Sequence, residues 1–232
     1  MINGVLGLLG VFTVGLGYFF IKDIYVHRES LEPETHLGLN VGIGFLTDML
    51  DTLGIGSFAV TTALFRGFKQ VKDRVLPGTL NVGHALPTVG EALAFLTVIK
   101  VDFLTLVSMI AASAVGAVWG AGIVSRLSER KIRFVMGFAL LVTDFLMISG
   151  QMGWIKELGV GSAIGLSGVK LIIAIVGNFI LGALMTAGVG LYAPCMALVY
   201  LLGMSPAVAF PIMMGSCAFL MPPASFKFIK AG

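Results

Sequence analysis

The sequence predicts an all-α, polytopic membrane protein built from two inverted repeats, each with transmembrane helices and a glycine-broken, re-entrant helix pair. Of the 232 residues, 57% are hydrophobic and 12% are charged, and the mean hydropathy is +1.01. Soluble domains carry roughly a quarter of their residues as charged ones. Several apolar stretches are long enough to cross a bilayer, and the chain repeats itself. Its basic residues are spread over short loops, which indicates membrane topology and no nucleic-acid partner.

The simple transmembrane helices are expected in five places. Residues 2–21 form an uncharged run long enough to cross about 30 Å of hydrocarbon at 1.5 Å per residue. Nothing basic precedes this run, so we expect a retained helix and no cleaved signal peptide. The other spans are 79–99, 103–124, 134–152 and 207–229. Within 103–124, small residues recur every fourth position (Ala112, Gly116, Gly120), a spacing that lets two helix backbones approach closely.

Two further apolar stretches, 37–65 and 165–202, are interrupted by Gly54-Ile55-Gly56 and Gly188-Val189-Gly190. At an offset of 134 residues, 8 of the 21 positions aligned around these breaks are identical. The chain is therefore predicted to be duplicated, with a first repeat over 1–133 and a second repeat over 134–232. The 103–124 helix would have its counterpart beyond residue 232, so the second repeat is expected to be incomplete.

The basic residues also predict the orientation of the chain. Loops 66–78 and 125–133 each hold four Lys or Arg residues, whereas loops 100–102 and 153–161 hold one each. The positive-inside rule places the first two loops in the cytoplasm, and the second two loops and the N-terminus outside. The two broken stretches would then dip into the membrane from opposite sides and return. Such inverted repeats, with a site near the midplane, are typical of secondary transporters.

The broken helix ends are candidate sites for an anion. Helix ends inside a membrane leave N–H and C=O groups that need partners, and a helix N-terminus carries partial positive charge. The helices beginning at Ser57 and Leu191 could therefore hold an anion on their backbone amides. The alternative is that these glycines only permit close packing. The repetition of the break at matching positions favours the binding site.

The segments GFLTDMLDTLGIGSFAV (44–60) and NFILGALMTAGVGLYAP (178–194) resemble the TauE/SafE sulfite and sulfonate exporters, small bacterial permeases built from a duplicated four-segment unit. Ser57 and Leu191 stand where that family's pattern would have a third glycine. The resemblance implies export of a sulfite, a sulfonate or another small organic anion across the cytoplasmic (inner) membrane of a bacterium. It implies no covalent chemistry, cofactor or metal. The expected partners are the anion and the lipid bilayer, and a homodimer is left open.

Carried onto this chain, the resemblance places substrate-binding hydroxyl and backbone groups at both breaks. Asn81 and Ser216 are added because they match at an offset of 135. These groups would replace the hydration shell of the anion. The full set expected to bind substrate is Thr52, Gly54, Gly56, Ser57, Asn81, Thr186, Gly188, Gly190, Tyr192 and Ser216.

Four ionisable residues are candidates for coupling transport to an ion: Asp48, Asp51, His84 and Glu91. Such groups are rare within membranes and usually functional. Asp48 and Asp51 are three residues apart on one helical arm and share a face. The alternative is that both are hydrated at the cytoplasmic surface. His84 either carries a proton or, as we favour, bonds a neighbouring carbonyl group.

Two other functions stay open at this point. The first is proton- or cation-coupled uptake that uses Asp48 and Asp51. The second is an intramembrane protease, because Gly165-Leu166-Ser167-Gly168 spells a GxSG motif. That motif needs a histidine from a later helix, and all three histidines precede it. The sequence therefore predicts a transporter and not an enzyme.

Overall fold

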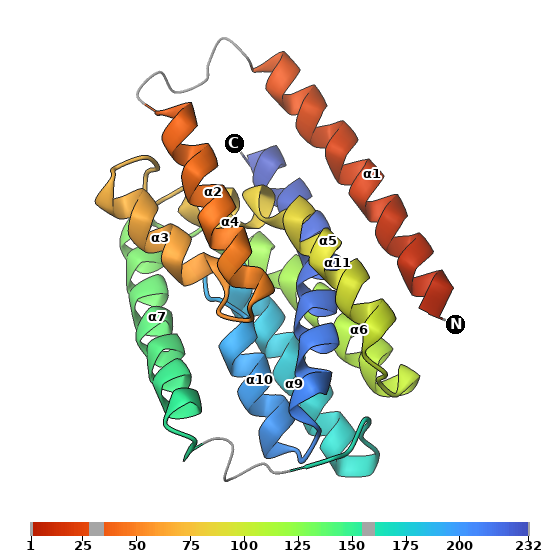
Figure 1. Cartoon of the computed structure of the whole chain (residues 1–232). Coiled ribbons are helices and arrows are strands. Elements are labelled where there is room, and N and C mark those ends of the chain that lie inside the picture. Colours follow the sequence, from red (N-terminus) through yellow and green to blue (C-terminus); the bar gives the residue numbers. More distant parts are fainter. Residues whose placement is uncertain (1, 28–34, 155–160, 232) are drawn as a thin grey trace.

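The computed structural model describes residues 2–27, 35–154 and 161–231. Within these ranges the chain is helical, with one isolated bridge between Ala163 and Met204 and no β-strand. Part of the predicted loop 153–161 lies outside the described residues, as does part of the connection between the first helix and the first broken stretch. The helices are α1 (Ile2–Val26), α2 (Leu37–Thr52), α3 (Ser57–Gly67), α4 (Leu76–Gly83), α5 (Ala85–Val98), α6 (Phe103–Val124), α7 (Glu129–Gln151), α9 (Gly168–Met185), α10 (Tyr192–Leu201) and α11 (Pro206–Ala231) (Figure 1).

The helices have the length and composition of a membrane protein. Among the described residues, four are long and apolar enough to cross a bilayer: Asn3–Val26, Phe103–Val124, Gly168–Met185 and Pro206–Lys230. Helix α11 lies at the centre, where it packs against α4, α5, α6, α10 and α1 (Figure 1). In its most apolar stretch, 83% of the residues of α11 are buried, compared with 11% in α1. Helix α1 lies at the border of the bundle and contacts α11 through edge-on aromatic pairs such as Phe19 with Phe226. These proportions confirm the all-α, polytopic class.

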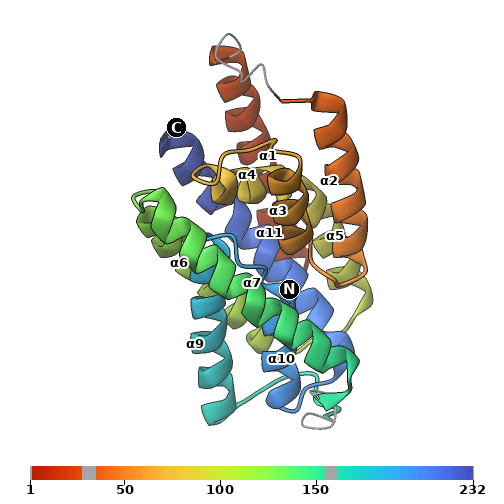
Figure 2. The ribbon, with the colours of Figure 1, turned by 90° about the vertical axis from the view of Figure 1, so that its left-hand side faces the viewer.

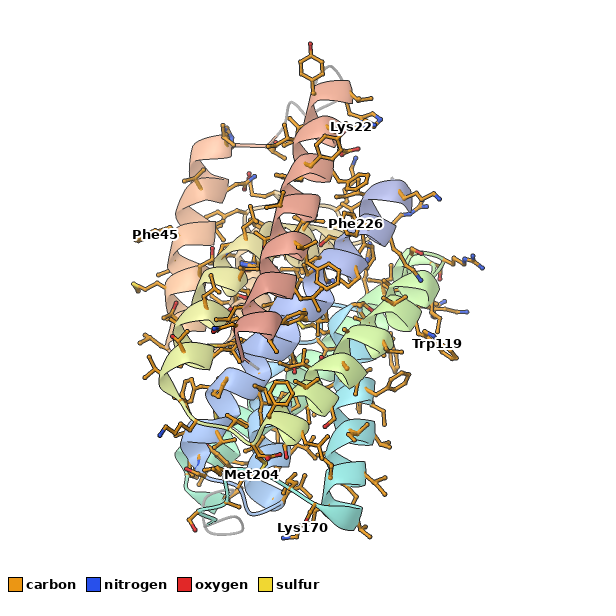
Figure 3. All side chains as sticks on the ribbon, turned by 90° about the vertical axis from the view of Figure 1, so that its right-hand side faces the viewer. Lys22, Phe45, Trp119, Lys170, Met204 and Phe226 are labelled. Carbon is orange, nitrogen blue, oxygen red and sulfur yellow. The ribbon has the colours of Figure 1, made fainter. Side chains whose placement is uncertain are left out.

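The predicted small-residue stripe faces another helix, and that helix is α9. A side chain at Gly116 or Gly120 would collide with the backbone of α9 at Phe179 or Ala183, and one at Gly182 would collide with the backbone of α6 at Ser113. The two backbones therefore touch, and only glycine fits between them. Trp119, on the same helix α6, points away from the bundle (Figure 3).

Both glycine breaks are present, and a third break was not predicted. Residues 79–99 were expected to form one span, but the chain divides at His84 into α4 and α5, and α4 lies across one end of the bundle (Figure 2). Pro87 gives a physical reason: it has no N–H to donate to the carbonyl of Gly83, so the hydrogen-bond ladder is interrupted there. The helix predicted over 79–99 is thus divided into two helices, and whether these cross the membrane as one span stays a prediction.

Two sets of contacts show which loops share an end of the molecule. Asp73 accepts from Arg66 (Nε to Oδ1, 2.7 Å) and Arg133 (Nε to Oδ2, 2.8 Å), which joins the α3–α4 connection to the start of α7. At the other end, the N–H of Asp102 donates to the carbonyl of Ile164 (2.8 Å). The loops predicted to be cytoplasmic therefore lie together, and the 100–102 loop contacts the segment that precedes α9. Which end faces the cytoplasm stays a prediction.

The two broken pairs approach the middle of the molecule from opposite ends. Helix α2 begins and α3 ends at the end that carries Lys22, whereas α9 begins and α10 ends at the end that carries Lys170 (Figures 1 and 3). Each pair turns at its glycine break and returns. This arrangement fits the predicted re-entry from two sides, while the inverted relation of the two repeats stays a prediction.

Candidate functional site

The first break ends α2 and starts α3 through two glycines in left-handed conformations. Gly54 has φ +82° and Gly56 has φ +93°, values that residues with a Cβ rarely adopt. Ser57 then opens α3, and its backbone N–H donates to Oδ1 of Asp51 at 2.5 Å. The N-terminal amide predicted to hold a substrate anion is thus already bound by a carboxylate from the last turn of α2. Asp51 is only 3% exposed.

The second break has a related but not identical backbone. Helix α9 ends at Met185, Gly188 takes φ +92°, and Leu191 caps α10, which begins at Tyr192. Gly190 is not among the residues with positive φ in the described chain, so glycine is not required there by conformation. The side chain of Tyr192 extends from the first residue of α10 toward the first break, where it meets Asp51.

The two breaks meet at one small cavity of about 10 Å³. A volume of roughly this size accommodates about one water molecule. The tips of the two pairs are therefore closed around each other. The cavity is lined by Asp51, Gly56, Ser57 and Phe58 from the first break, by Met185, Gly190, Leu191 and Tyr192 from the second, and by Met221 of α11.

Three helices bring two carboxyl groups to the hydroxyl of Tyr192. The oxygen Oη lies 3.0 Å from Oδ2 of Asp51 and 3.1 Å from Oε2 of Glu91. Thr52 at the end of α2 donates from Oγ1 to Oε1 of Glu91 at 2.8 Å. Tyr192 is 4% exposed and Glu91 is 8% exposed, so the group is enclosed by protein. Residues from α2, α5 and α10 thus form one polar cluster beside the cavity.

A second polar pair lies next to this cluster. Nδ1 of His84 is 2.6 Å from Oδ1 of Asp48, and Nε2 is 3.0 Å from Oγ1 of Thr61. His84 was expected to bond a carbonyl group, and its side chain contacts a carboxylate and a hydroxyl instead. Asp48 and Asp51 do share a face of α2, as predicted, but both contact protein groups, and the alternative of two hydrated surface carboxylates does not describe Asp51.

Comparison with known proteins identifies the family. A sequence model described as "Sulfite exporter TauE/SafE" matches residues 2–147, which is more than half of the chain. The chain belongs to the TauE/SafE family. The matched part contains the first break, Glu91 and His84, while the second break and Tyr192 follow it. No match was found among curated proteins or among solved structures.

In this TauE/SafE protein, six of the ten predicted binding residues do not line the cavity: Thr52, Gly54, Asn81, Thr186, Gly188 and Ser216. The amide nitrogen of Asn81 donates to the carbonyl of Pro77 (2.8 Å), and Thr186 donates to the carbonyl of Ala183 (2.7 Å). Ser216 accepts from Nδ2 of Asn178, which also donates to the carbonyl of Met109 (both 2.8 Å). These buried polar groups join helices α6, α9 and α11 or cap helix ends. A role of these three residues in substrate binding stays a prediction.

Sequence reasoning missed several residues that shape the site. Phe58, Met185 and Met221 line the cavity, and nothing in their spacing distinguishes them from other apolar residues of the chain. Thr61 was identifiable in principle, because it lies one helical turn after Ser57 and so shares its face. Among the described residues, no group of three or more His, Cys, Asp or Glu is arranged to hold a metal ion.

Proposed function

We propose that this TauE/SafE permease exports a small sulfur-containing anion, sulfite or a sulfonate, across the cytoplasmic membrane of a bacterium. The observation that carries the proposal is that two breaks far apart in the sequence line one cavity. Broken helices that meet near the middle of the bundle are the usual place for a substrate in secondary transporters. The family membership supports a permease for anions of the sulfite type.

The chemistry of the cavity suits an oxyanion. Helices α3 and α10 both begin at the cavity wall and direct partial positive charge toward it, and in this closed conformation the Ser57 N–H of α3 is bound by Asp51. Gly56 and Gly190 present backbone and no side chain, which lets the oxygens of an SO₃ group approach the amides. The hydroxyl of Tyr192 adds a further donor. The residues that line the cavity include no lysine or arginine, and the acid among them, Asp51, would have to lose its charge or move away before an anion binds.

A transport cycle requires this cavity to enlarge. An SO₃ group is several times larger than one water molecule, so the tips must separate before it can enter. Hinges are available at the Gly54–Gly56 turn and at the break beside His84. Opening of the first pair toward one side and of the second pair toward the other would give alternating access.

The test is a flux assay with the whole chain in liposomes. Loaded vesicles should release sulfite and methanesulfonate at least tenfold faster than protein-free vesicles, and chloride and phosphate should serve as competitors. Gly56→Leu should abolish the flux because it fills the cavity and forces an unfavourable φ. Gly42→Leu is the matched control, because Gly42 is exposed on α2 with open space around it. Equal flux in protein-free vesicles, or a Gly56→Leu variant as active as the control, would contradict the proposal.

Coupled uptake is the second candidate, and the burial of Asp51 and Glu91 beside the cavity favours it. Export and uptake can be distinguished by measuring the concentration of sulfite inside cells. Cells that produce the exporter should hold less internal sulfite than cells with Gly56→Leu when both are loaded equally. An uptake system would give the opposite result.

A further inference from the structure

We propose that Asp51, Glu91 and Tyr192 form a proton-binding site that couples movement of the anion to movement of one proton. In the closed conformation the two carboxyl groups share one proton. A second proton neutralises Asp51, releases it from the N-terminus of α3 and leaves the Ser57 amide to the anion. This inference deepens the proposed function and rests on the same site.

The first step is a count of hydrogens around Tyr192. Its hydroxyl has one hydrogen to donate, yet Oη lies within hydrogen-bond distance of both Asp51 (3.0 Å) and Glu91 (3.1 Å). Ionised carboxylates only accept hydrogen bonds. One of the two contacts therefore needs a hydrogen from a carboxyl group, so the pair carries a proton. Two bare carboxylates at one buried hydroxyl would also repel each other strongly.

The second step assigns that proton to Glu91. Asp51 accepts the Ser57 N–H at the positive end of α3, which favours its ionised form. Glu91 then donates from Oε2 to Oη of Tyr192, and Tyr192 donates to Oδ2 of Asp51. The remaining oxygen of Glu91 accepts from Thr52 (2.8 Å). The result is a directed chain from the Glu91 carboxyl through the phenol to the Asp51 carboxylate.

The titratable groups around Asp51 and Glu91 have other partners and do not take part in sharing the proton. The other charged or titratable residues that act on the pair are His84 at the α4–α5 junction and Cys217 on α11, with Asp48 bound to His84. Both ring nitrogens of His84 already have a partner: Nδ1 contacts Oδ1 of Asp48 at 2.6 Å, and Nε2 contacts Oγ1 of Thr61. The Cys217 thiol faces the sulfur of Met185 at 3.5 Å. The Asp51–Glu91 pair is thus the part of this region that shares a proton between two acids.

The third step connects the proton to the anion. The Asp51 carboxylate occupies the same amide that an incoming anion would use, and its charge opposes a second negative charge in the cavity. A protonated Asp51 loses both effects. Anion and proton therefore bind together and move in the same direction, one proton for each monovalent anion. By linkage, the affinity for the anion should fall about tenfold for each unit of rising pH.

The first experiment uses the whole chain in liposomes that contain a pH indicator. Methanesulfonate is the probe, because as the anion of a strong acid it brings no proton of its own at neutral pH. Its entry should acidify the interior by one proton for each sulfonate. Asp51→Asn should lose this acidification, and its affinity for methanesulfonate should change less than twofold for each pH unit. Sulfonate entry without a pH change in the unmodified protein would overturn the coupling and leave the proposed export intact.

The second experiment tests the shared proton without transport. Infrared difference spectroscopy of the purified protein at neutral pH should show the C=O stretch of a protonated carboxyl group, and Glu91→Gln should remove it. Asp23→Asn, in the last turn of α1, is the control and should leave the band unchanged. Absence of the band in the unmodified protein would refute the shared proton. If no sulfite or sulfonate moves in the flux assay, the export proposal fails and this spectrum still decides the proton site.

Discussion

The two broken helix pairs use the same turn for different purposes. In the first pair, α2 has an outer face that carries Phe45, which is 75% exposed (Figure 3). The same helix directs Asp48 and Asp51 toward His84 and Tyr192 inside the bundle. In the second pair, α9 presses its backbone onto α6, and α10 contributes one functional hydroxyl from Tyr192. The comparison teaches that the first pair provides acidic groups on a loosely held arm, while the second provides a fixed support.

The largest effect expected from this difference concerns two glycines, one in each pair. Gly182→Ala should destabilise the protein by about 3 kcal/mol or more, because the new methyl group meets the backbone of Ser113, which cannot move aside. Gly42→Ala should be neutral or slightly stabilising, because Gly42 has open space around it and alanine favours helix. Thermal unfolding in detergent measures both. Equal transition temperatures for the two variants would show that the second pair is not the fixed one.

The next prediction removes the single polar contribution of the second pair to the site. Tyr192→Phe keeps the ring but leaves both carboxyl groups without the shared hydroxyl, a loss of about 1.5 to 3 kcal/mol for hydrogen bonds to charged groups. Transport should fall at least tenfold and its pH profile should shift. Tyr200→Phe on the same helix is the control, because Tyr200 does not line the cavity. Unchanged flux and pH profile in Tyr192→Phe would mean that the first pair works without the second.

The turns themselves give a smaller and asymmetric effect. Gly56→Ala places a Cβ on a residue with φ +93°, at a cost of about 1 to 2 kcal/mol, whereas Gly190→Ala meets its nearest neighbour, Phe58, at 3.9 Å and keeps an ordinary backbone. The first substitution should lower both the unfolding temperature and the flux, and the second should leave the unfolding temperature nearly unchanged. Similar losses at both positions would indicate that the two turns are equivalent after all.

The sequence predicted most of the helices and both Gly-x-Gly breaks because their signals are local, but it did not predict the division at His84. A hydrophobic run of a given length or a Gly-x-Gly needs no knowledge of neighbours. Gly56 and Tyr192, both among the predicted binding residues, line the same cavity, and their role in binding stays a prediction. The sequence could not show that Asp51 would occupy the Ser57 amide, because that contact depends on how sharply the Gly54–Gly56 turn folds α3 back.

Three of the predicted binding residues show how limited sequence reasoning is for polar groups. Asn81 and Ser216 were added by offset and Thr186 by the resemblance, and in this conformation their polar atoms bond groups of the packed interior. A buried polar side chain must find a partner whether or not it binds a ligand, so polarity in an apolar segment does not separate the two roles. Glu91 was identified as ionisable, but its contact with Tyr192 was not predicted. The two residues are 101 positions apart, so only the fold brings them together.

The smallest effect is expected where the α3–α4 connection meets the start of α7. A hydrogen bond from Arg66 and the charges of Arg66 and Arg133 hold the pKa of Asp73 below its ordinary value of 3.8. A lowered folded-state pKa stabilises the protein above the ordinary value, and this stabilisation is lost as pH falls through the lowered one. Asp73→Asn should therefore cost under about 1 kcal/mol at neutral pH and nothing at strongly acidic pH. Chemical unfolding at both pH values measures this difference in stability. A larger loss of stability would mean that the contact between the α3–α4 connection and α7, and not the contact between α6 and α9, is the rigid part of the molecule.

The 10 Å³ cavity has a consequence for any titration of this protein with its anion. A conformation that admits only a water molecule is not the one that binds an SO₃ group, so the measured dissociation constant is the intrinsic constant divided by the fraction of molecules that are open. Substitutions that merely loosen the tips would then tighten apparent binding while slowing the return step. Affinity and turnover in this permease should consequently change in opposite directions.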